Sequence, residues 1–175
     1  MNSMYPKKLS ARETPAAKPA TGAANRGGPR IQVRRSGIHG KGVFALRPIF
    51  KGERIVEYTG SVVTWKQAKK LPPHNPDDPN HTFFFHIDNK HVINGLDGGN
   101  AAKWINHACG PNCEADEVDK QIFITALRDI EPGEELNYDY GLILDGKHTK
   151  KVKKEFACHC GTRKCRGTML AKKKK

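Results

Sequence analysis

The sequence predicts a mostly β fold with a few short helices. Short runs rich in β-branched and aromatic residues recur between turns that contain Gly or Pro, which is the pattern of strands. The chain has 175 residues, near the size of one domain, and only two stretches carry helix signals. The expected strands are Ile31–Arg35, Val43–Leu46, Arg54–Tyr58, Phe83–Asp88, His91–Ile93, Gln121–Ala126 and Glu135–Tyr138.

Composition divides the chain into segments. Residues 1–29 combine Pro, Ala, Gly, Lys and Thr without apolar periodicity, which predicts a disordered basic arm. We expect an ordered domain over residues 30–146, followed by a basic linker over 147–155. A cysteine-rich segment over 156–170 and a basic tail over 171–175 complete the predicted organisation.

The helices and turns are signalled by capping and turn residues. Thr64 is a candidate N-cap for a helix over Thr64–Leu71, which the following prolines end. A second helix is predicted over Ala101–His107. Asn89-Lys90 has the chemistry of a hairpin turn, and Glu131-Pro132-Gly133 that of a turn before the last strand.

Positive charge is concentrated at the two ends of the chain. The net charge is +13, of which residues 1–30 carry +5 and residues 147–175 carry +11, whereas residues 31–146 carry −3. A folded nucleic-acid-binding domain normally presents a basic face, so the central part suits a cationic partner better. Its acids, mainly within 114–119 and 129–139, are equally typical of a solvated surface.

Cysteine usage favours a metal site. No stretch approaches the roughly 20 apolar residues of a membrane span, and the N-terminal stretch lacks the apolar core of a Sec signal. We therefore expect no membrane association and no extracellular disulfide framework, so the five cysteines indicate a metal site or free thiols. Cys158, Cys160 and Cys165 are close enough to bind one zinc ion, with a redox-active cluster as the alternative. The candidates for a fourth ligand are Cys113, Cys109, His159 and His107.

Three further motifs have both a structural and a functional interpretation. Ser36–Ala45 is a Gly-rich turn before a strand, where a ligand could approach the backbone, although such glycines also serve ordinary turns. Asn106 and His107 follow an apolar pair, either as helix-end caps or as contacts to a polar ligand. Tyr138 and Tyr140 stand two residues apart, so on a strand they share one face, in a core or in a site.

Taken in order, these motifs resemble the SET-domain protein lysine methyltransferases with a post-SET cysteine segment. The resemblance covers about residues 31–170 and rests on SGIHGKGVFA, IVEYTG, GNAAKWINHACGPNC, IEPGEELNYDYG and CHCGTRKCRGTML. It implies a fold of small curved sheets with a knot-like threading of the C-terminal segment, and a zinc-bound post-SET segment. It also implies S-adenosylmethionine-dependent methylation of a lysine in a basic protein segment, with a histone or histone-like protein as the candidate substrate.

The resemblance implies roles for individual residues. Tyr140 takes the catalytic position and Tyr138 the position that controls the number of methyl groups, and both line the lysine channel with Phe83. Cys109 is left as a packed thiol. S-adenosylmethionine would bind to Gly40, Lys41, Gly42, Asn106, His107, Phe156 and Leu170, and structural zinc to Cys113, Cys158, Cys160 and Cys165.

The chain departs from the family pattern near the channel. Phe83 stands where many members have tyrosine, Asn94-Gly95 replaces the usual Asp-Ala, and Lys103-Trp104 replaces the usual Arg-Phe. These departures concern product number, and we expect mainly monomethyl-lysine with some dimethyl-lysine. The alternative function is a non-catalytic nucleic-acid- or histone-binding module that keeps the fold.

Partners and location follow from the same reasoning. The basic termini suit nucleic-acid contact or nuclear entry, in addition to the protein substrate. We expect a monomer in the nucleus or on chromatin, of its own cell or, for a bacterial protein, of a host cell. The cytoplasm is the alternative location.

Overall fold

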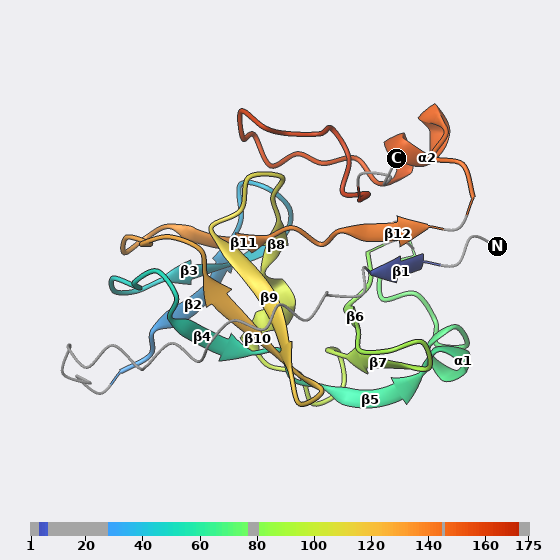
Figure 1. Cartoon of the computed structure of the whole chain (residues 1–175), viewed down its shortest axis with the longest axis horizontal. Coiled ribbons are helices and arrows are strands. Elements are labelled where there is room, and N and C mark those ends of the chain that lie inside the picture. Colours follow the sequence, from blue (N-terminus) through green and yellow to red (C-terminus); the bar gives the residue numbers. More distant parts are fainter. Residues whose placement is uncertain (1–3, 7–27, 77–80, 145, 172–175) are drawn as a thin grey trace.

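The computed structural model describes residues 4–6, 28–76, 81–144 and 146–171. Short strands form four small sheets of two to four strands each, and the helices are brief (Figure 1). The predicted mostly β fold with short helices is therefore confirmed. None of the described helices is long and apolar enough to cross a membrane.

The central sheet brings the polar motifs of the sequence together. Its strands, in spatial order, are β2 (Ile31–Arg35), β3 (Lys41–Ala45), β11 (Glu135–Tyr138) and β8 (Asn106–His107). β8 and β11 run parallel, with His107 opposite Tyr138. The Asn-His motif and the Tyr-Asp-Tyr motif thus lie side by side although they are distant in sequence.

Two other sheets contain three strands each. The first has the spatial order β4 (Arg54–Glu57), β10 (Gln121–Ala126) and β9 (Cys113–Val118). The second has the order β5 (Ser61–Thr64), β7 (His91–Asn94) and β6 (Phe84–His86). The predicted turn at Asn89-Lys90 connects β6 to β7. The carboxylate of Asp88 stabilises it by accepting hydrogen bonds from the backbone N–H groups of Lys90 and His91, at 2.7 and 2.8 Å.

The fourth sheet pairs segments from the two ends of the chain. β1 (Met4–Pro6) runs antiparallel to β12 (Leu142–Leu144). β1 falls within the arm over residues 1–29 that we predicted to be disordered, so that prediction is wrong for these three residues. The rest of the arm up to residue 27, and residues 172–175 of the basic tail, lie outside the described residues.

The helices differ in extent from the predictions. α1 (Trp65–Ala68) begins at the predicted cap Thr64, which forms a capping box with Gln67. Where we predicted a helix over Ala101–His107, the 3₁₀ helix η1 (Ala101–Trp104) ends early, because Asn106 and His107 pair with β11 instead. α2 (Lys150–Glu155) occupies part of the predicted basic linker, where no helix was expected.

Two hydrophobic clusters hold the fold together. The main core contains Val43, Ile49, Ile105, Ile122, Ile124, Ile130 and Leu136, all at most 1% exposed. A second cluster of Leu144, Phe156 and Leu170 joins β12 to the C-terminal segment. Burial of each of these side chains contributes roughly 1.5–3 kcal/mol, so apolar packing as well as the cysteines holds this segment in place.

Candidate functional site

Asn106 is the centre of a buried polar network. Its side-chain Nδ2 lies 2.9 Å from the Lys41 carbonyl oxygen, 3.2 Å from that of His39 and 2.8 Å from Glu135 Oε1. The Ser36 hydroxyl donates to the same carboxylate oxygen at 2.7 Å. Because a buried amide needs partners, these contacts bind the Gly-rich turn to β8 and β11.

Two glycines of the turn serve different purposes. Gly40 has a φ of +47°, a left-handed conformation that glycine adopts readily, and no atom lies within 4 Å of where its Cβ would be. A Cβ on Gly42 would lie 2.2 Å from Glu135 Oε1, so a side chain there would displace the carboxylate. The turn therefore keeps an exposed backbone at Gly40 over a closely packed polar network.

His107 connects the tyrosine motif to a cysteine. Its Nδ1 accepts a hydrogen bond from the backbone N–H of Tyr140 at 3.1 Å, so the proton of the neutral ring is on Nε2. Nε2 lies 3.3 Å from Cys109 Sγ. Burial lowers the pKa of His107 to about 4, against the opposing effect of the Asp139 carboxylate, so the ring is neutral at pH 7.

Tyr138 and Tyr140 pack against each other, with ring centroids 4.9 Å apart. The Tyr140 hydroxyl donates to the Ile105 carbonyl oxygen at 2.7 Å. Burial raises the pKa of both phenols above the ordinary value of 10. Both hydroxyls are therefore protonated at neutral pH, and they can position a neighbouring group but cannot act as strong bases.

Tyr58 is, like Tyr138, a buried tyrosine of the core, and it was not predicted from the sequence as a site residue. Its hydroxyl donates to the Phe83 carbonyl oxygen at 2.8 Å, and its ring lies 5.1 Å from that of Phe85. Burial raises its pKa, and the nearby Tyr140 raises it further. The available signal was the tyrosine of the IVEYTG motif, at the end of an apolar strand.

An aromatic wall adjoins the tyrosines. Phe83 is 4% exposed, and its ring centroid lies 4.9 Å from that of Trp104 in an edge-to-face arrangement. The Lys41 ammonium lies 4.6 Å from the Trp104 ring centroid, within the range of a cation–π contact. Tyr58 links Phe83 to the tyrosine pair, because its hydroxyl binds the Phe83 carbonyl oxygen and its ring packs against Phe85, whose ring centroid lies 6.1 Å from that of Tyr138.

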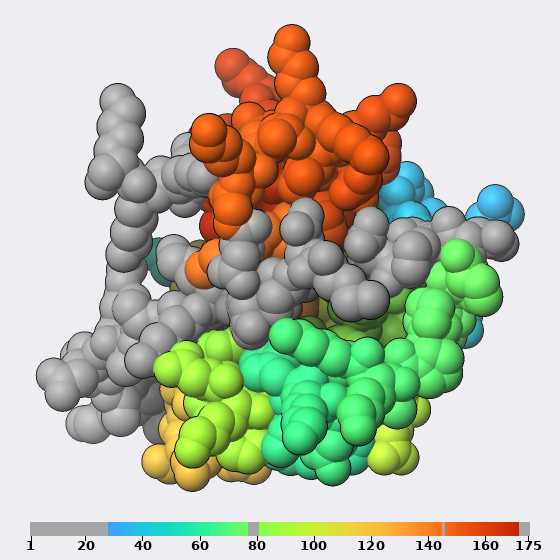
Figure 2. All heavy atoms as spheres, turned by 90° about the vertical axis from the view of Figure 1, so that its right-hand side faces the viewer, coloured from blue at the N-terminus to red at the C-terminus, as the bar shows by residue number. Residues whose placement is uncertain are grey.

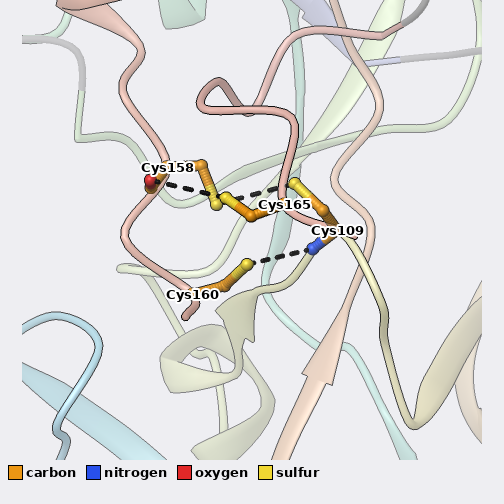
Figure 3. Close-up of side chains that lie close together, drawn as sticks. All are labelled: Cys109, Cys158, Cys160 and Cys165. Atoms are coloured by element: carbon orange, nitrogen blue, oxygen red, sulfur yellow. Dashed lines mark hydrogen bonds between the residues drawn. The ribbon is translucent and has the colours of Figure 1, made fainter. Parts of the chain in front are cut away.

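Four cysteines form a cluster that corrects the predicted metal ligands. The Sγ atoms of Cys109, Cys158, Cys160 and Cys165 all lie within 4.8 Å of one another (Figure 3). The prediction of Cys113 as the fourth ligand is wrong, because Cys113 is fully buried in the main core, where it faces Ala126 across β9 and β10. Cys109, which we predicted to be a packed thiol, takes its place.

The cluster fits a tetrahedral zinc site. A tetrahedron with Zn–S bonds of about 2.3 Å has S–S edges of about 3.8 Å, and the Sγ atoms of Cys109 and Cys158 are 3.6 Å apart. Backbone N–H groups point at the sulfur atoms, as from Arg166 to Cys109 at 3.3 Å. At Cys160 the effect of burial is outweighed by hydrogen bonds from Thr162 and the Cys109 N–H, which lower the pKa to about 6.

The C-terminal segment contacts the tyrosine motif directly. The Arg166 guanidinium binds the Asp139 carboxylate through two hydrogen bonds of 2.7 and 2.8 Å. Leu170 forms a β-bridge with Leu142, and the Thr168 hydroxyl donates to the Phe156 carbonyl oxygen at 2.9 Å. In Figure 1 this segment, in orange and red, runs above β8, β11 and β12.

Comparison with known proteins identifies the family. The SET domain family model matches residues 40–141. The chain belongs to the SET-domain family. The match begins at Gly40 within the Gly-rich turn and contains the Asn-His motif and both tyrosines, whereas the cysteines from Cys158 onward follow it.

The similar curated proteins are much longer than this chain. Histone-lysine N-methyltransferase ATX2 of Arabidopsis thaliana is 37% identical over 80% of this chain and 13% of its own length. Histone-lysine N-methyltransferase 2B of Homo sapiens is 37% identical over 78% of this chain and 5% of its own length. Histone-lysine N-methyltransferase trithorax of Drosophila melanogaster is 36% identical over 78% of this chain and 4% of its own length. The chain thus spans only a small part of these relatives.

Proposed function

We propose that this chain is an S-adenosylmethionine-dependent protein-lysine N-methyltransferase that acts on a basic segment of a histone or histone-like protein. The main observation is the packed pair Tyr138 and Tyr140, held beside His107 in a chain of the SET-domain family. The names of the similar proteins, which are histone-lysine N-methyltransferases, support the reaction and the substrate class.

The Gly-rich turn and the Asn-His motif are the proposed cofactor site. Gly40, Lys41 and Gly42 offer backbone groups, and the space around Gly40 is open to a ligand. Asn106 holds this turn against β11, and His107 lies beside it on β8. Phe156 and Leu170, which pack together in the C-terminal segment, are proposed to contact the cofactor as well. Bound S-adenosylmethionine would supply a methyl group on a positively charged sulfur.

The aromatic region prepares the lysine of the substrate for reaction. A lysine amine has a pKa near 10.4, so at neutral pH only about one in a thousand is uncharged. A channel walled by Phe83, Tyr138 and Tyr140 disfavours the ammonium form and lowers the pKa of the bound lysine. Because the tyrosine hydroxyls stay protonated, Tyr140 orients the amine for in-line transfer, and the lysine loses its proton to solvent.

The cysteine cluster is proposed to hold structural zinc. Four cysteine ligands, Cys109, Cys158, Cys160 and Cys165, leave no open coordination position for substrate, so their role is to fix the C-terminal segment. That segment carries Phe156 and Leu170, and through Arg166 it also contacts Asp139.

Product number and location complete the proposal. The Tyr138 hydroxyl would hold a water that takes the room a methylated amine needs to rotate for a second transfer. Phe83 lacks the hydroxyl common in the family and restrains the amine less, so the expected product is mainly monomethyl-lysine with some dimethyl-lysine. The expected location is the nucleus or chromatin, where the substrate lies, and the enzyme is expected to act as a monomer.

Tyr140→Phe tests the proposed reaction. Wild-type protein incubated with labelled S-adenosylmethionine and core histones should transfer label to lysine, which mass spectrometry locates. The variant keeps the ring and loses one hydroxyl, so it should lose most activity while circular dichroism and cofactor binding remain unchanged. Near wild-type turnover would exclude Tyr140 as a catalytic residue. Histone binding by the wild type without label transfer would support the non-catalytic binding module instead.

A further inference from the structure

Five exposed lysines form a surface that the proposed reaction does not use. This lysine patch consists of Lys147, Lys150, Lys151, Lys153 and Lys154. Four of the five lie on α2, which with the neighbouring C-terminal residues forms the top of the molecule in Figure 2, where side chains in orange project outward. Among the described residues, no carboxylate forms an ion pair with any of these lysines.

Packing fixes the patch in an outward orientation. The Thr149 side chain caps α2 by accepting a hydrogen bond from the Val152 N–H at 3.3 Å. Val152 packs against the cluster that contains Phe156 and Leu170. Like charges at helical spacing of three or four destabilise a helix by about 0.2–0.5 kcal/mol per pair, so α2 depends on this packing. An external polyanion would remove that repulsion.

The chemistry of the patch favours nucleic-acid phosphate over an acidic protein. Binding hot spots between proteins are rich in Trp, Tyr and Arg, and residues 147–155 contain none of these. Lysine is a compact point charge that suits phosphate contacts. Residues 147–155 also contain no Phe, Tyr or Trp, and His148 is the one ring among them on which an unpaired base could stack, which favours a duplex over a single strand.

We propose that the lysine patch binds the phosphate backbone of double-stranded DNA without sequence preference. Residues 147–155 contain no Arg, Asn or Gln, which make many of the bidentate contacts to base edges, and lysines that contact phosphate position a protein on the duplex without reading its sequence. Residues 31–146 carry a net charge of −3 and residues 147–175 carry +11, so the molecule would approach DNA with this end.

The position of the patch relates DNA binding to the proposed function. α2 leads directly into Phe156, and the same segment reaches Asp139 through Arg166. DNA on the patch would therefore lie next to the cofactor side of the site. This part rests on the proposed function, and it identifies the substrate as a lysine-bearing protein bound to the same duplex.

The binding test uses the zinc-loaded full chain and a short fluorescent duplex, in two unrelated sequences, over about 50–200 mM salt. The slope of log K against log salt is about −0.9 for each phosphate neutralised. Changing Lys150, Lys151, Lys153 and Lys154 to Gln should therefore make the slope less negative by up to about 3.6, and lower affinity at least tenfold. A control removes the same charge from exposed lysines elsewhere, by changing Lys51, Lys66, Lys70 and Lys90 to Gln. It should change the slope by less than about 1.

Each contrary outcome overturns the proposal. Equal effects of the patch variant and the control would show general charge attraction only. Preference for a single strand, strong dependence on sequence, or tighter binding to an acidic polypeptide than to the duplex would each identify another ligand.

A methylation assay separates this proposal from the reaction. The patch variant should keep the wild-type rate on a free histone peptide but lose any advantage on the same histone assembled on DNA. Because the binding assay needs no methyl transfer, an inactive protein that binds duplex would contradict only the proposed function. An active protein that does not bind the duplex would contradict only the proposed DNA binding by the lysine patch.

Discussion

Gly95→Ala is expected to destabilise the protein through the hydroxyl of Tyr58. A Cβ on Gly95 would lie 2.7 Å from Tyr58 Oη and 3.2 Å from both Lys103 Cβ and the Phe83 carbonyl oxygen. The first distance is shorter than real Cβ contacts, so the tyrosine must move. The movement would break the 2.8 Å hydrogen bond from Tyr58 to Phe83.

The expected magnitude follows from opposing effects. Gly95 is not among the glycines with positive φ, so alanine fits the backbone and would by itself stabilise by about 0.4–1 kcal/mol. Overpacking a tight core costs about 1–3 kcal/mol, and a lost hydrogen bond a further 0.5–1.5 kcal/mol or so. The free energy of unfolding should therefore fall by about 0.5–4 kcal/mol.

A double-mutant cycle with Tyr58→Phe tests the mechanism, because phenylalanine lacks the atom that clashes. Urea unfolding of the four proteins should show that Gly95→Ala costs at least about 1 kcal/mol less in the Tyr58→Phe background. Additivity within about 0.5 kcal/mol would refute the reasoning.

We also expect a larger monomethyl fraction from Gly95→Ala, because the displaced hydroxyl of Tyr58 takes up room near Tyr138 and Tyr140. A shift to dimethyl product, measured by mass spectrometry, would contradict this.

The remaining predictions concern zinc, product number and closure of the site. Cys109→Ser should reduce bound zinc from about one per chain to near zero. Cys113→Ser should keep its zinc, but its buried hydroxyl should lower the free energy of unfolding by about 1–3 kcal/mol. Elemental analysis measures the zinc and urea unfolding the stability, and equal zinc in the two variants would contradict the cluster. Tyr138→Phe should raise the methylation state of the product in mass spectra, and an unchanged distribution would remove its proposed role. Arg166→Met breaks the pair with Asp139 but leaves all the thiols, so the zinc content should not change. The KM for S-adenosylmethionine should rise by a larger factor than kcat falls. An unchanged KM would show that Arg166 does not help the C-terminal segment to close the cofactor site.

The strands that were predicted from sequence have strong local patterns. Gln121–Ala126 alternates buried and partly or fully exposed residues, and its branched side chains at Ile122 and Ile124 fill the core. The neighbouring strand Cys113–Val118 was missed because its inward residues at the start, Cys113 and Ala115, are small and its other residues are mostly acidic. Apolar and acidic residues do alternate at the start of this strand, but its apolar residues there are small and give a weak strand signal.

The error over the fourth thiol has a similar physical cause. Cys109 and Cys113 are four residues apart in one motif, so either can reach the C-terminal cysteines when only spacing is considered. The choice depends on the pairing of residues 113–118 with β10, which directs Cys113 into the core and leaves Cys109 in the loop before it. Such pairing depends on distant residues and cannot be read from the motif itself. The knot-like threading stays a prediction.

The Cys109 correction changes how the metal site relates to the reaction. Cys113 is buried in the main core, whereas Cys109 Sγ lies 3.3 Å from His107 Nε2. A cysteine bound to zinc is a thiolate, which accepts the proton on Nε2 as a hydrogen bond and leaves Nδ1 free to accept from the Tyr140 N–H. Zinc would therefore fix the tautomer of His107 as well as the C-terminal segment. Loss of zinc should then disturb the position of Tyr140 as well as the cofactor site. We therefore expect kcat to fall even at saturating S-adenosylmethionine, in addition to a lower affinity for S-adenosylmethionine.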